Sequence, residues 1–261
     1  MFSQAERRDL RECLVAAARE DDRIRAAAVV GSAAANREDE WSDIDLAFRL
    51  AAGLEAADVG DAWTGRMYDD HGAVDHVDVW SGSALFRVFL LSSSMQVDLS
   101  FWPWETFAAS GASFRLLFGE ANKPRSSSSP TPETLLGMGW LHALHARSSI
   151  ARGRNLQALY MVNGLRDHVI SLACLRHGLP AHQGRGVDDL PPDAMETIAQ
   201  TLVPGLRRSE LSTAFANAIT ALIDEAEQID PGLASRLSEP ARELVRTASG
   251  PRGEPTEDPV R

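Results

Sequence analysis

Two aspartates are placed where together they could bind a cation. Asp43 and Asp45 belong to the sequence Ser-Asp-Ile-Asp-Leu-Ala-Phe at 42–48, whose alternating polar and apolar residues predict a β-strand. Because successive side chains of a strand point to opposite faces, the two carboxylates share one face. Carboxylates about 4 Å apart repel each other by roughly 4 kcal/mol at an effective dielectric constant near 20. A cation relieves this repulsion, and Mg²⁺, which prefers carboxylate and phosphate oxygens, is the expected ion.

A third aspartate, Asp98, lies on the polar face of another predicted strand, 95–101. An isolated Asp-x-Asp pair more often only faces solvent, so this further strand carboxylate strengthens the case for a metal site. Asp75 and Asp78 are alternatives for the third carboxylate. They are three residues apart and would face opposite sides of a regular strand, and Asp75 is better interpreted as a turn residue. Asp98 is therefore the preferred third carboxylate.

Gly31 and Ser32 form a turn that could bind phosphate. They follow an apolar run at 24–30 that predicts a strand, and a short helix is expected to start over 33–37. Glycine lets backbone approach a phosphate without a clash from Cβ, and the hydroxyl and N–H groups near a helix N-terminus can donate to it. Alone, a Gly-Ser pair is only a turn. Its interpretation as a phosphate site depends on the aspartates that follow.

Gly31-Ser32, ten intervening residues and then Asp43-x-Asp45 on a strand resemble the signature of the DNA polymerase β-like nucleotidyltransferases. The resemblance is strongest to small bacterial members that modify aminoglycoside or lincosamide antibiotics, and to uncharacterised relatives. It implies that Asp43, Asp45 and Asp98 are catalytic and hold two Mg²⁺ ions across a nucleoside triphosphate. It also implies transfer of a nucleoside monophosphate, AMP from ATP, to a hydroxyl group with release of pyrophosphate.

Two details of the resemblance concern individual residues. Asp98 could bind metal, accept the proton of the attacking hydroxyl, or do both. Many family members have a second glycine shortly after the serine, where this chain has Ala35-Asn36. Asparagine tolerates positive φ better than most residues, so the loop can still form.

Arginines in the C-terminal half could neutralise the triphosphate. We assign this role to Arg154 and Arg166, because a guanidinium suits bidentate phosphate contacts. The alternative is that Arg166 and Asp167 are ordinary surface charges on a helix. The sequence over 151–180 resembles, more loosely, the helical domain of this branch of nucleotidyltransferases, which forms the acceptor pocket.

The elements that must position these groups fall into two halves, which predict an α+β fold. A mixed or antiparallel sheet with flanking helices (by resemblance a polymerase β-like palm) precedes a C-terminal helical bundle. The expected parts are a catalytic domain at 1–122, a linker at 123–131, a helical acceptor-selecting domain at 132–249 and a disordered tail at 250–261.

Individual elements follow from periodicity and from turn residues. In the first half we expect a helix over 4–20, strands over 24–30, 43–48, 74–80, 85–91 and 95–101, a helix over 54–68, and helical segments through 107 and around 114–118. In the second half we expect helices over 132–151, 156–175, 193–202, 210–227 and 231–248, with a loop over 178–191.

Composition narrows the possible partners. The 261 residues carry a formal net charge of −11, which argues against a nucleic-acid interface, because such interfaces depend on Lys and Arg. No apolar run reaches the roughly 20 residues of a membrane helix, and the charged N-terminus lacks a signal core. Two widely separated cysteines predict neither a disulfide framework nor a zinc site. We therefore expect a cytoplasmic protein that binds neither nucleic acid nor membrane.

Three functions remain consistent with the sequence. The first is an enzyme that transfers a nucleotide from an NTP to a small-molecule hydroxyl, an antibiotic being the acceptor that the resemblance suggests. The second is a protein-modifying, AMPylating nucleotidyltransferase of the toxin–antitoxin type. The third is a catalytically silent nucleotide-binding module, against which the set of three aspartates speaks.

Overall fold

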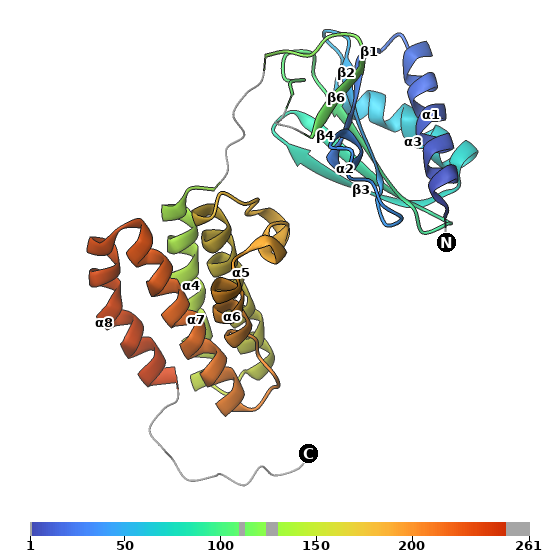
Figure 1. Ribbon diagram of the computed structural model, residues 1–261. Helices are drawn as coiled ribbons and strands as arrows, with labels where there is room; N and C mark the ends of the chain where they lie inside the picture. The colour runs from blue at the N-terminus through green and yellow to red at the C-terminus, as the bar shows by residue number, and fades with distance from the viewer. Residues whose placement is uncertain (1, 110–112, 124–129, 249–261) are drawn as a thin grey trace, which may run out of the picture. The chain divides into compact units, whose positions relative to one another are not determined.

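The computed structural model describes residues 2–109, 113–123 and 130–248 (Figure 1). The chain divides into two compact units, Met1–Ser127 and Ser128–Arg261. Most of the expected linker and all of the expected tail, 250–261, lie outside the described residues. Among those that are described, no helix is both long and apolar enough to cross a bilayer.

The first unit is built on a six-stranded sheet with the strand order β3-β4-β5-β2-β1-β6. Its strands are β1 (Ile24–Val30), β2 (Ile44–Leu50), β3 (Ala73–Ser81), β4 (Ala84–Leu91), β5 (Gln96–Trp102) and β6 (Phe114–Phe118). Among the described strand pairs, only β2 and β5 run parallel, and the other neighbours are antiparallel. The mixed sheet predicted from the sequence is thereby confirmed.

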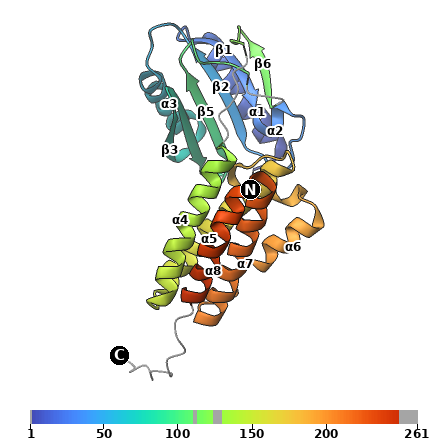
Figure 2. The same ribbon diagram turned by 90° about the vertical axis from the view of Figure 1, so that its left-hand side faces the viewer.

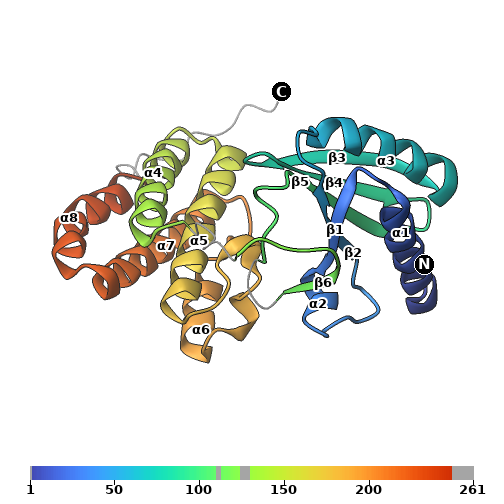
Figure 3. The ribbon, with the colours of Figure 1, turned by 90° about the horizontal axis from the view of Figure 1, so that it is seen from above.

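Helices α1 (Gln4–Glu20) and α3 (Ala56–His71) pack on one face of this sheet (Figure 3). Helix α1 begins with a capping box, in which Ser3 accepts from the Glu6 backbone N–H and Glu6 accepts from the Ser3 backbone N–H. Leu14 of α1 and Trp63 of α3 are buried in the same cluster as Phe48 of β2. Burial of this face leaves the alternate residues of each strand to form the second face of the sheet.

The second unit is a bundle of helices with its own core (Figure 2). Its α-helices are α4 (Pro132–Ala151), α5 (Asn155–Arg176), α6 (Pro192–Gln200), α7 (Arg208–Ile229) and α8 (Pro231–Ala248). The core contains Ile150, Leu165 and Phe215, and a bidentate pair between Arg176 and Glu225 joins α5 to α7. A helical C-terminal half was predicted, and the α+β assignment of the whole chain is confirmed.

Two local predictions were wrong. Residues 114–118, expected to be helical, form β6, because the apolar Phe-Arg-Leu-Leu-Phe sequence pairs with the free edge of β1. The segment after Pro103 makes one hydrogen-bonded turn, with Phe107 N donating to Pro103 O, and no helix. The loop expected over 178–191 does connect α5 to α6, and it contains two 3₁₀ turns, His182–Gly184 and Val187–Asp189.

Candidate active site

Asp45 and Asp98 are direct neighbours on the second face of the sheet. The parallel register of β2 and β5 pairs Asp45 with Asp98, and strands paired in this way lie about 4.8 Å apart. Their flanking residues, Ile44 and Leu99 among them, are buried against α1 and α3. The alternation of β2 and β5 therefore turns both carboxylates away from these helices. This juxtaposition agrees with the sequence-based grouping of the two residues.

The environment of Asp98 disfavours its negative charge. Its Oδ1 atom is buried and has no hydrogen-bond partner among the described residues. Burial and, to a smaller extent, the neighbouring Asp43 carboxylate together raise the pKa of the Asp98 carboxyl to about 6. A buried carboxylate oxygen without a partner fits a site that receives a cation or a proton.

Asp43 is the last residue before β2 and completes the group of three. Gln96 of β5 donates from Nε2 to Asp43 Oδ2 at 3.1 Å. Within the described residues, no group of three or more His, Cys, Asp or Glu side chains could enclose a metal by itself. Mg²⁺ commonly takes only one or two carboxylates and completes its shell with phosphate oxygens and water. The carboxylates present therefore suit an ion that arrives with a phosphorylated substrate.

Gly31 brings the turn after β1 directly against Asp45. A Cβ atom at position 31 would overlap Asp45 Oδ2, and the φ of Gly31 is +65°, in the region that glycine favours. The expected helix is shorter and earlier than predicted: α2 covers Gly31–Ala34, so Ser32 lies inside it. Asn36 follows with a φ of +53°, which confirms the expectation that asparagine can replace glycine in this turn.

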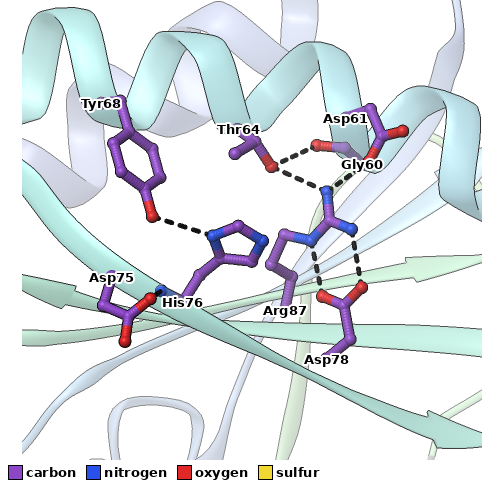
Figure 4. A network of polar contacts seen from close by, with 8 residues as sticks. All are labelled: Gly60, Asp61, Thr64, Tyr68, Asp75, His76, Asp78 and Arg87. Carbon is purple, nitrogen blue, oxygen red and sulfur yellow. Dashed lines mark hydrogen bonds and ion pairs between the residues drawn. The ribbon is translucent and has the colours of Figure 1, made fainter.

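The alternative carboxylates serve other purposes. Arg87, which is buried on β4, donates to both carboxylate oxygens of Asp78 at 2.6 and 2.7 Å, and this charge pairing lowers the pKa of Asp78 (Figure 4). Arg87 also contacts Asp61 and Thr64 of α3, so Asp78 faces α3 and not the second face of the sheet. Asp75, expected in a turn, is an exposed residue of β3.

Arg154 and Arg166 belong to the helical unit. Arg154 is the exposed residue that precedes α5. Arg166 lies on α5, and its Nη2 atom is 3.4 Å from Asp167 Oδ1, the surface pairing that was the alternative to phosphate binding. Their assignment to phosphate binding stays a prediction.

Two residues near the aspartates were not found from the sequence. Gln96 looked like one polar residue of an alternating strand, and nothing in the chain predicts that it reaches Asp43. Arg7 is one of several charged residues in the helix expected over 4–20, yet its side chain is buried and its Nη1 atom donates to the Ser42 carbonyl at 2.9 Å. Arg7 and Ser42 are 35 positions apart in the sequence, and Gln96 and Asp43 are 53 positions apart. Local sequence patterns cannot predict contacts over such separations.

Comparison with known protein families and with characterised protein sequences gives no match. Comparison with solved structures finds similarity to the crystal structure of an aminoglycoside 6-adenyltransferase from Bacillus subtilis, at 13% sequence identity and a TM-score of 0.41. The alignment covers 94% of this chain and 99% of that one.

Proposed function

We propose that this protein is a Mg²⁺-dependent nucleotidyltransferase that moves a nucleoside monophosphate, AMP by preference, from an NTP to a hydroxyl group. The observation that carries the proposal is the pairing of Asp45 with Asp98, which has a buried carboxylate oxygen without a hydrogen-bond partner among the described residues. The packing of Gly31 against Asp45 supports it, because a phosphate-binding turn and the carboxylates then form one site.

The donor side of the site follows from these residues. Asp43, Asp45 and Asp98 would hold two Mg²⁺ ions, which neutralise phosphate charge and stabilise the attacking and leaving oxygens of an in-line displacement. Because Gly31 has no side chain, this turn packs directly against the Asp45 carboxylate, and the Ser32 hydroxyl of the same turn can donate to a phosphate. We further propose that Arg154 and Arg166 neutralise the triphosphate and that the helical unit selects the acceptor.

Asp98 is suited to accept a proton. A general base works best when its pKa lies near the working pH, and in the metal-free protein burial and the neighbouring Asp43 raise the pKa of Asp98 to about 6. In the proposed reaction the acceptor oxygen bonds to the α-phosphorus and the bond from that phosphorus to pyrophosphate breaks. The hydroxyl proton passes to Asp98.

The first test is pyrophosphate release with each NTP, with and without Mg²⁺, in the presence of candidate acceptors. Asp45→Asn should abolish release, whereas Asp75→Asn, the same change at an exposed position of β3, should not. Activity that survives Asp45→Asn would refute the site. Nucleotide binding without turnover on any acceptor would instead favour the silent binding module.

The acceptor class is tested separately. We expect transfer of labelled nucleotide to a small-molecule hydroxyl, for which aminoglycosides and lincosamides are the first compounds to try. Label that appears only on purified proteins would favour the AMPylating alternative and contradict a small-molecule acceptor.

A further inference from the structure

Helix α1 holds the loop that leads into Asp43. This loop, residues 37–42, connects the turn after α2 to β2. Arg7 of α1 is only 4% exposed, its Nη1 atom donates to the Ser42 carbonyl at 2.9 Å, and its Nε atom lies 3.5 Å from Glu38 Oε1. The Ser42 carbonyl belongs to the peptide bond that leads into Asp43. Arg7 therefore acts on the backbone next to this aspartate.

A buried arginine needs a reason, because burying a guanidinium costs free energy unless its donors are paired. Arg7 is paired by the Ser42 carbonyl and by Glu38, whose carboxylate also contacts Arg11. An apolar residue at position 7 would fill the same space without this cost. Unlike an apolar residue, arginine holds the loop to α1 through a directional hydrogen bond to the Ser42 carbonyl.

The loop has a second set of hydrogen bonds, but these lie within the loop itself. Asp39 Oδ1 accepts from the Trp41 backbone N–H at 2.9 Å, and Ser42 Oγ accepts from the Asp39 backbone N–H at 3.0 Å. They shape the turn without connecting it to the rest of the unit. Trp41 of the loop is 70% exposed, so little packing holds the tip of the loop in place. The start of the loop is held by the Arg37 backbone N–H, which donates to the Ser32 carbonyl at 2.9 Å. Arg7 and Arg11 both contact Glu38 from α1, but of the two only Arg7 reaches the backbone next to Asp43.

We propose that Arg7 is a positioning residue, which fixes the Ser42 peptide so that the Asp43 carboxylate stands beside Asp98. Gln96 restrains the same carboxylate from β5. The inference rests on the proposed function, because it takes Asp43 as a metal ligand. Residues that orient metal ligands typically change metal affinity or activity by about 10–100-fold when they are mutated.

The test compares three variants of the full chain. Arg7→Met removes both contacts, Arg7→Lys keeps a cationic donor, and Arg11→Met is the matched control, because Arg11 contacts Glu38 but not the Ser42 carbonyl. Mn²⁺ binding is measured by electron paramagnetic resonance with a non-hydrolysable ATP analogue present. Amide exchange of residues 37–43 is measured by mass spectrometry without metal.

We expect Arg7→Met to raise the Kd for Mn²⁺ by about 10-fold or more and to speed exchange over 37–43. Exchange over β2 should stay unchanged, Arg7→Lys should recover part of the affinity, and Arg11→Met should leave Kd within about twofold. Should Arg7→Met fail to fold, Arg7→Lys carries the test, with a smaller rise in Kd expected in the same direction.

Faster exchange or a lower Tm with an unchanged Kd would show that Arg7 only stabilises the fold, and would overturn the inference. The control for the proposed function is Asp45→Asn. If the wild-type protein binds Mn²⁺ no better than Asp45→Asn, the proposed metal site is refuted, and the positioning role of Arg7 is refuted with it. If Asp45→Asn loses binding while Arg7→Met keeps it, only the positioning role is refuted.

Discussion

Asp98 and Asp78 are carboxylates of one sheet whose surroundings act on their charge in opposite directions. Asp78 accepts two hydrogen bonds from the Arg87 guanidinium, which lowers its pKa. Asp98 is buried beside Asp43, and its pKa rises to about 6. A carboxylate stabilised by a guanidinium needs no further partner, whereas one that is destabilised by burial can bind a cation or take up a proton. Of these two carboxylates, Asp98 is the one with the properties of a reactive group.

The raised pKa of Asp98 predicts a pH-dependent stability of the metal-free protein. The native state holds the Asp98 proton up to about pH 6, whereas the unfolded chain releases it near pH 3.9. The free energy of unfolding that Asp98 contributes should therefore fall as pH rises from about 4 to 6, by roughly 1–3 kcal/mol. Urea unfolding in EDTA at several pH values measures it, and Asp98→Asn should remove this part of the pH dependence.

Asp78 provides a control of opposite sign. Its lowered pKa means that its contribution to stability is present above the pKa of the unfolded chain and is lost as pH falls. The difference between wild type and Asp78→Asn should therefore grow toward neutral pH. A difference between wild type and Asp98→Asn that followed the same direction would contradict the environment described for Asp98.

Gly31 allows a prediction that separates backbone strain from crowding of the carboxylate. Gly31→Ala places a Cβ against Asp45 Oδ2 at a φ of +65°, while Gly53→Ala meets no described atom within 4 Å at a φ of +79°. Both should lose about 1–2 kcal/mol of stability from positive φ. Only Gly31→Ala should also lose nucleotide-dependent metal binding, measured by Mn²⁺ titration. Equal Mn²⁺ affinity in the two variants would mean that the Asp45 side chain can move away from the new Cβ atom without weakening metal binding.

At the scale of elements, Arg87 connects three of them through one guanidinium (Figure 4). It lies on β4 and contacts Asp78 of β3 and both Asp61 and Thr64 of α3. The Asp78 side chain is 33% exposed and the Asp61 side chain 73% exposed. The two carboxylates should therefore contribute unequally to stability.

We expect Asp78→Ala to destabilise the protein by about 2 kcal/mol, because it leaves much of a buried guanidinium without its bidentate partner. Asp61→Ala should cost less than about 1 kcal/mol, because the pair is screened by solvent. Chemical denaturation measures both. The two folded variants should keep wild-type nucleotide transfer, and a specific loss in Asp78→Ala would return Asp78 to the list of catalytic candidates.

The elements that could be predicted from the sequence are those with strong periodicity. The amphipathic helix 4–20 and the alternating strand 95–101 carry their own pattern, and the structure contains both as α1 and β5. The five residues of β6 have no period that separates strand from helix, and pairing with β1 decides their conformation. The burial of Arg7 could not be predicted for the same reason, because a charged side chain on a helix is buried only when a distant segment of the chain covers it.

For the whole molecule, the division into two units with separate cores predicts that each folds alone. A fragment ending at residue 123 contains the full sheet with Asp43, Asp45 and Asp98, and should bind Mn²⁺ with an ATP analogue, although more weakly than the full chain because it lacks Arg154 and Arg166. A fragment starting at residue 130 should show helical circular dichroism and a cooperative melt. Transfer to an acceptor should require the full chain, because the proposed acceptor selection lies in the helical unit. Transfer by the first fragment alone would contradict that role.

The parallel pairing of β2 with β5 also determines when during folding the site can form. Residues 51–95 separate the two strands and must themselves fold into α3, β3 and β4 before a parallel crossover can close. Closing such a segment costs chain entropy before any long-range contact compensates for it. During synthesis Asp45 leaves the ribosome well before Asp98, so an incomplete domain has no pair of carboxylates to hold a metal. In a refolding experiment, the helical circular dichroism signal should therefore return before nucleotide-dependent metal binding does. For the same reason, a growing chain should be unable to consume NTP until its catalytic half is complete.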